Sequence, residues 1–142
     1  MSVEIRALAC EADLHAAWPV VRQLRPHLDA GAFVAQALRQ AGEGYRATGL
    51  FDDGAVRAFA GWRVVEYLAH GRFLYVDDLV TDADTRSRGH GKALLDWLKA
   101  EARRLGCTSL QLDSGTQRKE AHAFYLREGL RIDSFHFGIA LD

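Results

Sequence analysis

The chain has 142 residues, and its 18 Lys and Arg against 19 Asp and Glu leave a formal net charge of -1. A chain of this length is expected to fold as one domain, 1–142, without disulfides or a structural metal. With 49% apolar and 26% charged residues, the composition is that of an ordinary globular protein. The near-zero charge argues against nucleic acid as the main partner, because that binding needs many Lys and Arg side chains.

Targeting and metal-binding signals are also missing from the sequence. No apolar run approaches the roughly 18 residues that would cross a bilayer, and the start, MSVEIRALACEAD, has neither the basic nor the apolar part of a signal peptide. We therefore expect a cytoplasmic protein without a membrane partner. Cys10 and Cys107 form no CxxC pair, and the six histidines include no HxH or HExxH motif. No metal site is predicted.

The first half of the chain predicts a strand, two helices and a β-hairpin. Pro19 is expected to kink or divide the first helix. Asp29 stands where an N-cap would begin the second helix, and Gly42 ends it. The tripeptide Asp52-Asp53-Gly54 is a strong hairpin signal between two strands rich in β-branched and aromatic residues. The predicted ranges are a strand at 3–7, helices at 12–24 and 30–41, and strands at 45–51 and 55–67.

The second half predicts alternating strands and helices, with Gly106 and Gly129 as helix ends. The complete order is β-α-α-β-β-β-α-β-α-β, which indicates an α/β (α+β) fold with a mixed sheet covered by helices. The alternation after Gly129 predicts a strand that finishes the sheet. The ranges are strands at 73–81, 108–112 and 130–141, and helices at 91–105 and 117–127.

The residues best suited to bind a ligand lie between the strand 73–81 and the helix 91–105. Gly89 and Gly91 let the main chain approach a ligand, and the helix start presents free N–H groups and the positive end of its dipole. Arg86, Arg88 and Lys92 add positive charge. This segment is a candidate phosphate-binding loop, although it matches neither the P-loop nor the Rossmann fingerprint. A glycine-rich turn with solvated arginines is the alternative.

Two motifs resemble those of one enzyme family. Arg86-x-x-Gly89-x-Gly91 after a strand resembles the acetyl-CoA pyrophosphate loop, (Arg/Gln)-x-x-Gly-x-(Gly/Ala), of the Gcn5-related N-acetyltransferases, or GNAT superfamily. About thirty residues later AHAFYLREGL, at 121–130, is similar to the second signature, Ala-x-x-Phe-Tyr-x-x-x-Gly-Phe. The resemblance implies a mostly antiparallel GNAT sheet, acetyl-CoA as co-substrate, and direct transfer of the acetyl group to an amine. The segment 121–129 with Phe135, Phe137 and Leu141 looks most like the aminoalkylphosphonate N-acetyltransferases.

The resemblance also implies roles for single residues. Main-chain groups of Leu79, Val80 and Thr81 match the strand positions that hold the cofactor at a bulge. Tyr125 matches the general acid that protonates the departing thiolate. Arg118 replaces an Asn that contacts the cofactor in many members, and it can reach a cofactor phosphate, an anionic substrate or solvent. The implied cofactor contacts are Leu79, Val80, Thr81, Arg86, Ser87, Arg88, Gly89, His90, Gly91, Lys92, Ala93, Arg118 and Tyr125.

The amine must lose a proton before it attacks, and three carboxylates are candidates for the base. Asp77 and Asp78 are neighbours on one strand, so we expect only one of them to face the substrate. Asp78 matches a Glu of the phosphonate enzymes. Asp113 ends the next strand, where peptide-N-terminus acetyltransferases carry a basic Glu. For each of the three, a solvated strand-end acid is the alternative interpretation.

Together these features predict an acetyl-CoA-dependent N-acetyltransferase that acts on the primary amine of a small molecule, with an aminoalkylphosphonate-like amine among the candidates. Two alternatives are a non-catalytic acetyl-CoA-binding or regulatory module and a protein or peptide N-acetyltransferase. The region 18–31, expected to wall the acceptor site, holds Arg25, His27 and Asp29. Dimers are common in the superfamily, so a homodimer is a further expectation.

Overall fold

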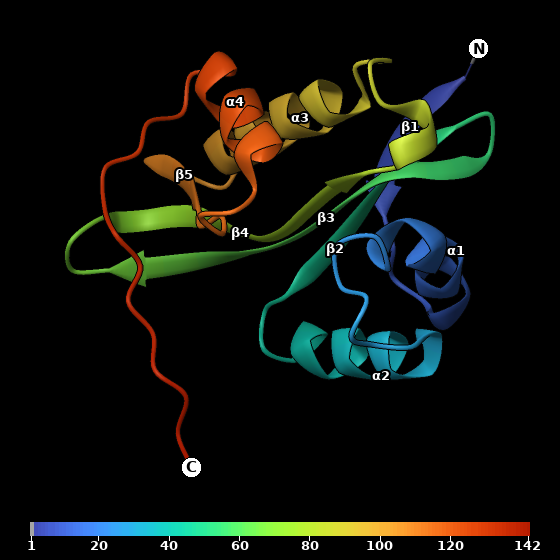
Figure 1. Cartoon of the computed structure of the whole chain (residues 1–142), viewed down its shortest axis with the longest axis horizontal. Coiled ribbons are helices and arrows are strands. Elements are labelled where there is room, and N and C mark those ends of the chain that lie inside the picture. The colour runs from blue at the N-terminus through green and yellow to red at the C-terminus, as the bar shows by residue number, and fades with distance from the viewer. Residues whose placement is uncertain (1) are drawn as a thin grey trace. The chain divides into compact units, whose positions relative to one another are not determined.

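The computed structural model describes residues 2–142. The chain divides into two compact units, Met1–Gln111 and Leu112–Asp142 (Figure 1). A five-stranded sheet of order β1-β2-β3-β4-β5 dominates the first unit. The strands are β1 Val3–Ala7, β2 Arg46–Asp52, β3 Ala55–Tyr67, β4 Gly71–Thr81 and β5 Ser109–Leu112.

The β2–β3 hairpin turns where the sequence predicts it. Asp53 and Gly54 both have positive φ, 50° and 84°, which is the geometry of a two-residue type I′ turn. The pairs β1–β2, β2–β3 and β3–β4 are all antiparallel. The predicted sheet flanked by helices is therefore confirmed, with strand ends that differ by one or two residues from the sequence prediction.

Helices cover both faces of this sheet (Figure 1). α1 (Glu11–Val21) and α2 (Ala30–Ala41) lie on one face, and α3 (His90–Arg104) packs on the other. Side chains alternate along β3, so Phe59 enters the core beneath α1 and α2, whereas Trp62 turns to Trp97 of α3 with ring centroids 6.1 Å apart. The core on the α1–α2 face includes Leu14, Ala17, Val20, Val21, Phe33, Val34, Ala37, Phe51, Phe59 and Val80.

The sequence predicted that Pro19 kinks or divides the first helix, and the structure shows no division there. α1 runs from Glu11 to Val21 with Pro19 inside it. Proline removes one N–H group from the helix ladder, but here it stands within the last turn, so few intrahelical bonds follow it. The Pro19 carbonyl also accepts a hydrogen bond from Gln23 Nε2 at 3.1 Å. α1 therefore continues past Pro19 to Val21.

A β-bulge interrupts the pairing of β3 with β4. Gly61 lies opposite Asp78 and Trp62 opposite Val76, so Asp77 has no opposite residue on β3. An extra residue in one strand bends that strand and shifts the alternation of its side chains. The bulge thus lies at the two adjacent acids of β4.

The second unit consists of α4 (Lys119–Arg127) and the segment that follows it. Gly129, with φ of 95°, ends α4 through two C-terminal hydrogen bonds, Gly129 N–H to Leu126 and Leu130 N–H to Tyr125. The strand predicted for 130–141 is wrong, because no helix or strand occurs after residue 129 in the described chain. An alternating sequence forms a strand only where a sheet edge pairs with it, and none does so here.

Candidate functional site

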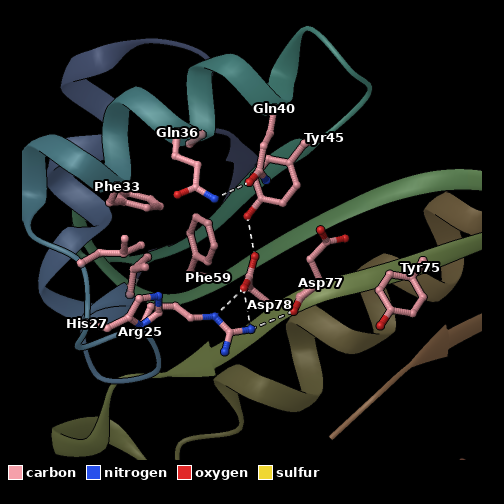
Figure 2. A pocket seen from close by; sticks show the side chains of 13 residues that line it. Arg25, His27, Phe33, Gln36, Gln40, Tyr45, Phe59, Tyr75, Asp77 and Asp78 are labelled. Atoms are coloured by element: carbon pink, nitrogen blue, oxygen red, sulfur yellow. Dashed lines mark hydrogen bonds and ion pairs between the residues drawn. The ribbon is translucent and has the colours of Figure 1, made fainter. Parts of the chain in front are cut away.

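A cavity of about 470 Å³ lies between the α1–α2 layer and strands β3 and β4 (Figure 2). This volume is typical of small-molecule sites. The cavity combines an apolar wall with a cluster of charged groups. Its lining residues are Val21, Arg25, His27, Leu28, Phe33, Gln36, Ala37, Gln40, Tyr45, Phe59, Tyr75, Asp77 and Asp78.

Asp78 is the less exposed of the two acids that line the cavity. Its Oδ1 accepts from Arg25 Nε at 2.9 Å and lies 2.8 Å from Arg25 Nη2, and its Oδ2 accepts from the Tyr45 hydroxyl at 2.7 Å. Its side chain is only 17% exposed. The contacts fix the orientation of the carboxylate toward the cavity (Figure 2). Arg25 lies in the turn after α1 and Tyr45 directly precedes β2, so two connecting segments hold this carboxylate of β4.

Asp77 also lines the cavity, which corrects the expectation that only one of the two adjacent acids faces it. The bulge places both side chains on the same face of β4. Asp77 forms a bidentate pair with Arg63 of β3, with the shortest contact 2.6 Å from Nη2 to Oδ2. The guanidinium of Arg63 also lies over the Tyr45 ring, 5.4 Å from its centroid. Both acids therefore carry an arginine partner.

The Tyr45 phenol is buried and stays protonated. Burial raises the pKa of Tyr45 far above its ordinary value, and the negative charges of Asp78 and Asp77 raise it further. Its hydroxyl passes directly over the backbone of Gly61. A Cβ at that position would overlap the Tyr45 hydroxyl and would lie 2.7 Å from Asp78 Oδ2. The contact between Tyr45 and Asp78 thus requires glycine on β3.

The loop between β4 and α3 has the geometry of an anion site. Ser87 and Gly89 both have positive φ, 73° and 80°, and a non-glycine residue in this region is uncommon. Gly89 is the N-cap of α3 and provides no side-chain cap, and its carbonyl accepts the first helical bond, from Ala93 N–H. The amides of the first turn, His90, Gly91 and Lys92, precede that ladder. The exposed residues 86–89 and 92 surround them.

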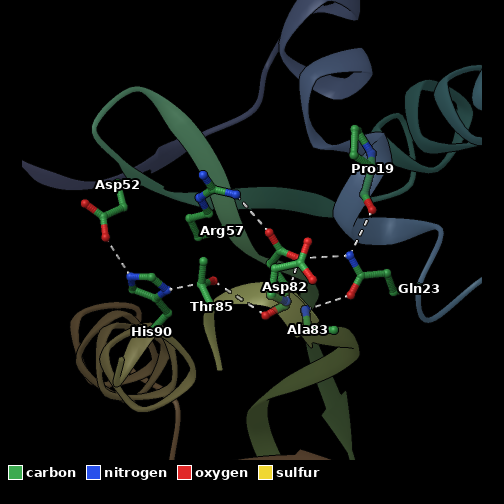
Figure 3. Close-up of polar contacts among 9 residues, drawn as sticks. Pro19, Gln23, Asp52, Arg57, Asp82, Ala83, Thr85 and His90 are labelled. Atoms are coloured by element: carbon green, nitrogen blue, oxygen red, sulfur yellow. Dashed lines mark hydrogen bonds and ion pairs between the residues drawn. The ribbon is translucent and has the colours of Figure 1, made fainter. Parts of the chain in front are cut away.

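His90 is part of this loop, but its ring faces inward (Figure 3). The side chain is buried, with Nε2 2.9 Å from Asp52 Oδ2 and Nδ1 3.5 Å from the Thr85 hydroxyl. Only the main-chain N–H of His90 thus remains for a cofactor. Asp52 Oδ1 is buried and has no hydrogen-bond partner among residues 2–142. The contact between His90 and Asp52 joins the start of α3 to the end of β2.

Asp82 connects the end of β4 to the same loop (Figure 3). It accepts hydrogen bonds from Arg57 at 2.9 Å, from Gln23 at 3.1 Å and from the Asp84 amide at 3.2 Å. Burial raises the pKa of Asp82, but these donors outweigh it and hold the pKa below its ordinary value. These hydrogen bonds hold Asp82 in place at the start of the loop.

Leu79, Val80 and Thr81 lie in β4 between the two acids and the loop. On one edge they pair with Ala60, Phe59 and Ala58 of β3. On the other edge β5 begins beside Arg72, since Thr108 N–H donates to the Arg72 carbonyl. A four-residue strand that starts there extends no further than about Val76. The outer main-chain edge of 79–81 is thus beyond the reach of β5.

The second unit holds the other predicted site residues. Tyr125 is 9% exposed. Burial raises its pKa, while the positive charge and hydrogen bond of Arg118 lower it in part. Arg118 thus contacts the Tyr125 phenol, which is a contact that the sequence did not predict. The Asp113 side chain is 46% exposed, 3.7 Å from His136 Nδ1. The unit thus brings Tyr125 and Arg118 together, and leaves Asp113 at the surface.

Sequence reasoning missed three residues of the cavity cluster: Tyr45, Gly61 and Arg63. Each lies in a sequence pattern typical of a strand in the sheet interior. The pairing of β2 with β3 positions Tyr45, and the pairing of β3 with β4 aligns Gly61 and Arg63 with the two acids. Of the region 18–31, Arg25 and His27 line the cavity, whereas Asp29 caps α2 by accepting from Ala32 N–H at 2.8 Å.

The described residues show neither a metal cluster nor a membrane helix. No three His, Cys, Asp or Glu side chains within 2–142 are arranged to hold a metal ion. No helix in the same range combines the length and apolarity needed to cross a bilayer.

Known proteins resemble this chain in sequence and in fold. The model of the acetyltransferase (GNAT) family matches residues 8–130. The uncharacterized N-acetyltransferase YhdJ of Bacillus subtilis is 34% identical over 138 residues, which cover 95% of this chain and 96% of that one. An aminoalkylphosphonate N-acetyltransferase of Salmonella typhimurium is 36% identical over 76 residues, 53% of this chain and 49% of the relative. The solved structure of aminoglycoside N-acetyltransferase AAC(6')-Iy with CoA has a TM-score of 0.86 at 15% identity, covering 99% of this chain and 95% of that one.

Proposed function

Because this chain belongs to the acetyltransferase (GNAT) family, we propose that it acetylates the primary amine of a small molecule by direct attack, without an acyl-enzyme. The protein is an acetyl-CoA-dependent N-acetyltransferase. The observation that carries the small-molecule acceptor is the cavity of about 470 Å³ with Asp77 and Asp78 on one wall. A peptide substrate would instead need an open groove. The proposal includes a cytoplasmic location and a homodimer.

The loop after β4 fits the phosphates of the cofactor. The uncapped amides at the start of α3 can donate to phosphate oxygens, and the helix dipole favours negative charge there. No atom lies within 4 Å of the position that a Cβ on Gly89 would take, so a ligand can approach the backbone. Arg86, Arg88 and Lys92 supply countercharge. When bound, acetyl-CoA supplies an acetyl group activated as a thioester.

The other proposed roles follow from the contacts of each residue. The outer main-chain edge of Leu79–Thr81 positions the cofactor by hydrogen bonds. Asp78 accepts an N–H of the amine and takes its proton, directly or through water. Tyr125 donates a proton to the departing thiolate, and its raised pKa keeps the phenol protonated at neutral pH. Asp113 remains the alternative base.

Release of free thiol from acetyl-CoA in the presence of an amine panel tests the proposal. The panel includes polyamines, aminoglycosides, aminoalkylphosphonates, simple alkyl and aryl amines, and peptides. We expect release with small primary amines and none with peptides. Thiol release with peptides alone would favour the protein N-acetyltransferase, and binding of acetyl-CoA without release for any amine would favour the non-catalytic module.

Tyr125→Phe tests the general acid. We expect kcat to fall by about a hundredfold while the KM for acetyl-CoA changes less than about twofold, because the ring still fills its buried position. Tyr67→Phe is the matched control, since Tyr67 is 53% exposed and lies outside the cavity lining. An unchanged kcat in Tyr125→Phe would remove the acid role.

A further inference from the structure

We infer that the buried contact between His90 and Asp52 positions the first amides of α3 and thereby sets the affinity for coenzyme A (Figure 3). His90 and Asp52 act as positioning residues, since both side chains are buried and neither meets the phosphates. The inference rests on the proposed function, because it takes the start of α3 as the site of the cofactor phosphates.

Two buried side chains attach the loop between β4 and α3 to the rest of the sheet layer. From residue 83 to residue 93 only Thr85 and His90 are buried, and residues 86–89 are all exposed. Thr85 precedes the exposed stretch and His90 follows it, and the Thr85 hydroxyl lies 3.5 Å from His90 Nδ1. The two ends of the exposed stretch therefore meet at the His90 ring.

Apolar packing holds α3 only beyond its first turn. The buried apolar residues of the helix are Leu94, Leu95, Leu98 and Ala102. Leu94 comes more than one turn after the N-cap Gly89, which has no side chain to cap the helix. Helix ends fray where few contacts hold them. The His90 ring is thus the buried side chain that can fix the first turn.

The partner of the His90 ring belongs to a fixed part of the sheet. Asp52 ends β2, where it lies opposite Val3 of β1 and Ala55 of β3. Its Oδ2 is 2.9 Å from His90 Nε2. A hydrogen bond to a carboxylate is directional and about twice as strong as one between neutral groups. This contact therefore fixes the ring, and with it the main-chain N–H groups that follow Gly89, relative to the sheet.

The chemistry of the contact favours positioning over simple stabilisation. Asp52 Oδ1 is buried and accepts no hydrogen bond from residues 2–142. A buried acceptor without a partner is unfavourable, and a buried polar pair is often no more stable than apolar side chains of similar volume. Such a pair does restrict the geometry of the elements that it joins, which is what a phosphate site made of main-chain amides requires.

Two variants of equal side-chain length separate the hydrogen bond from the filling of space. His90→Gln keeps an amide donor near the position of Nε2, whereas His90→Met has no donor, and Gln and Met have similar helix propensities. In calorimetry with coenzyme A, we expect Kd to rise at least about tenfold in His90→Met, because small displacements of binding groups are costly. In His90→Gln it should rise less than about threefold. Equal Kd values for the two variants would overturn the inference.

Thr48→Val is the matched control for a general loss of stability. Thr48 is a buried residue of β2, like Asp52, and its hydroxyl accepts from Trp62 Nε1 at 3.1 Å. It lies about 13 Å from Asp52 along the strand. The variant should lower Tm by about 2–6 °C and leave Kd for coenzyme A unchanged. If Thr48→Val weakened binding as much as His90→Met, loss of stability would explain both and the inference would fail.

Asp52→Asn gives a second test that does not leave a charge buried without its partner. The variant keeps the shape of the side chain and weakens the bond to the ring, so Kd for coenzyme A should rise about threefold. A Kd equal to that of the parent would overturn the inference, including the case in which His90→Met does not fold.

Steady-state kinetics distinguish positioning from a part in the reaction. His90→Met should raise the KM for acetyl-CoA about tenfold, with kcat within about twofold of the parent, because the buried ring meets no reacting atom. A fall in kcat with an unchanged KM would contradict the inference.

Gly89→Ala separates failure of this inference from failure of the proposed phosphate site. If Gly89→Ala binds coenzyme A as tightly as the parent, the phosphates do not lie at the start of α3, and both fail. If Gly89→Ala binds more weakly but His90→Met binds like the parent, the phosphate site stands and only the positioning role of His90 and Asp52 is wrong.

Discussion

Gly61 shows how one missing side chain shapes the cavity between the α1–α2 layer and strands β3 and β4. Its φ is ordinary, so glycine is not needed there for backbone freedom. It is needed because the Tyr45 hydroxyl and the Asp78 carboxylate lie over the β3 backbone at this point. The same hydroxyl holds Asp78 Oδ2, on the carboxylate that we propose binds the amine. A single methyl group on β3 would therefore disturb the orientation of the proposed base.

Gly61→Ala tests this argument. The new Cβ would overlap the Tyr45 hydroxyl, so we expect a loss of about 1–3 kcal/mol in the free energy of unfolding, as in other overpacked cores. The kcat/KM for the amine should fall about tenfold, while the KM for acetyl-CoA should change little. Urea unfolding and steady-state kinetics measure these effects.

Gly31→Ala is the matched control. Gly31 lies in α2, and a Cβ there would meet only Asp29 Oδ1 at an ordinary 3.5 Å. Alanine should stabilise the helix by about 0.5 kcal/mol and leave the kinetics unchanged. If Gly61→Ala behaved like this control, Tyr45 would have no part in holding Asp78.

The two ends of α3 use glycine for different purposes. Gly89, at φ of 80°, begins the helix beside the open amides, whereas Gly106, at φ of 76°, ends it with bonds from Gly106 N–H to Arg103 and from Cys107 N–H to Ala102. Both positions require the left-handed region, and for both no atom lies within 4 Å of an added Cβ. The two glycines thus have similar backbone conformations and similar free space for a Cβ atom. They differ in their distance from the proposed cofactor site.

Gly89→Ala and Gly106→Ala form a matched pair for this reason. Each should cost about 1–2 kcal/mol of unfolding free energy, because alanine is strained in the left-handed region. Only Gly89→Ala should raise the KM for acetyl-CoA, by about tenfold, since it changes the backbone next to the amides that we propose bind the phosphates. Thermal unfolding and KM measurements on both variants test this. A similar KM for both would place the phosphates elsewhere.

The stability of the whole molecule should depend on acid pH. Arg6 holds the pKa of Asp13 below its ordinary value, and Arg104 does the same for Glu101, in each case chiefly through a hydrogen bond. Burial raises the pKa of Asp82, but hydrogen bonds to Gln23, the Asp84 amide and Arg57 give a net lowering. The unfolded chain therefore takes up protons at higher pH than the folded chain does. The stability that these groups contribute is present above about pH 5 and decreases as the pH falls through their folded pKa values.

Asp82→Asn tests the contribution of Asp82, which is a buried carboxylate. We expect the variant to lose about 1–3 kcal/mol of unfolding free energy at pH 7, because Arg57 loses a charged partner. The difference from the parent should shrink toward pH 3, where Asp82 of the parent becomes protonated in the unfolded chain. Urea unfolding at pH 7, 5 and 3 gives the comparison. If the variant lost as much unfolding free energy at pH 3 as at pH 7, the lowered pKa of Asp82 would not contribute to stability.

Local rules explain which features could be predicted from the sequence. Asp53 and Gly54 form the expected turn, and Gly106 and Gly129 end the expected helices, since only a few neighbouring residues decide these conformations. The glycines and cations of 86–92 likewise lie in one continuous segment. The family motifs predict that this segment binds the phosphates of the cofactor. The roles of Tyr125 and of the cofactor-binding residues stay predictions.

Tertiary structure alone decided the cavity at Asp77 and Asp78 and the form of the tail 130–142. The bulge turned Asp77 and Asp78 to one face, and strand pairing brought Tyr45 and Arg63 to them, because these contacts join residues 14 to 33 positions apart. The tail kept a strand-forming sequence without a strand, since a strand requires a partner edge. The near-neutral charge of the chain was plain in its composition, but the pairing of Asp77 and Asp78 with two arginines required the fold. Composition counts charges, whereas packing decides which of them meet.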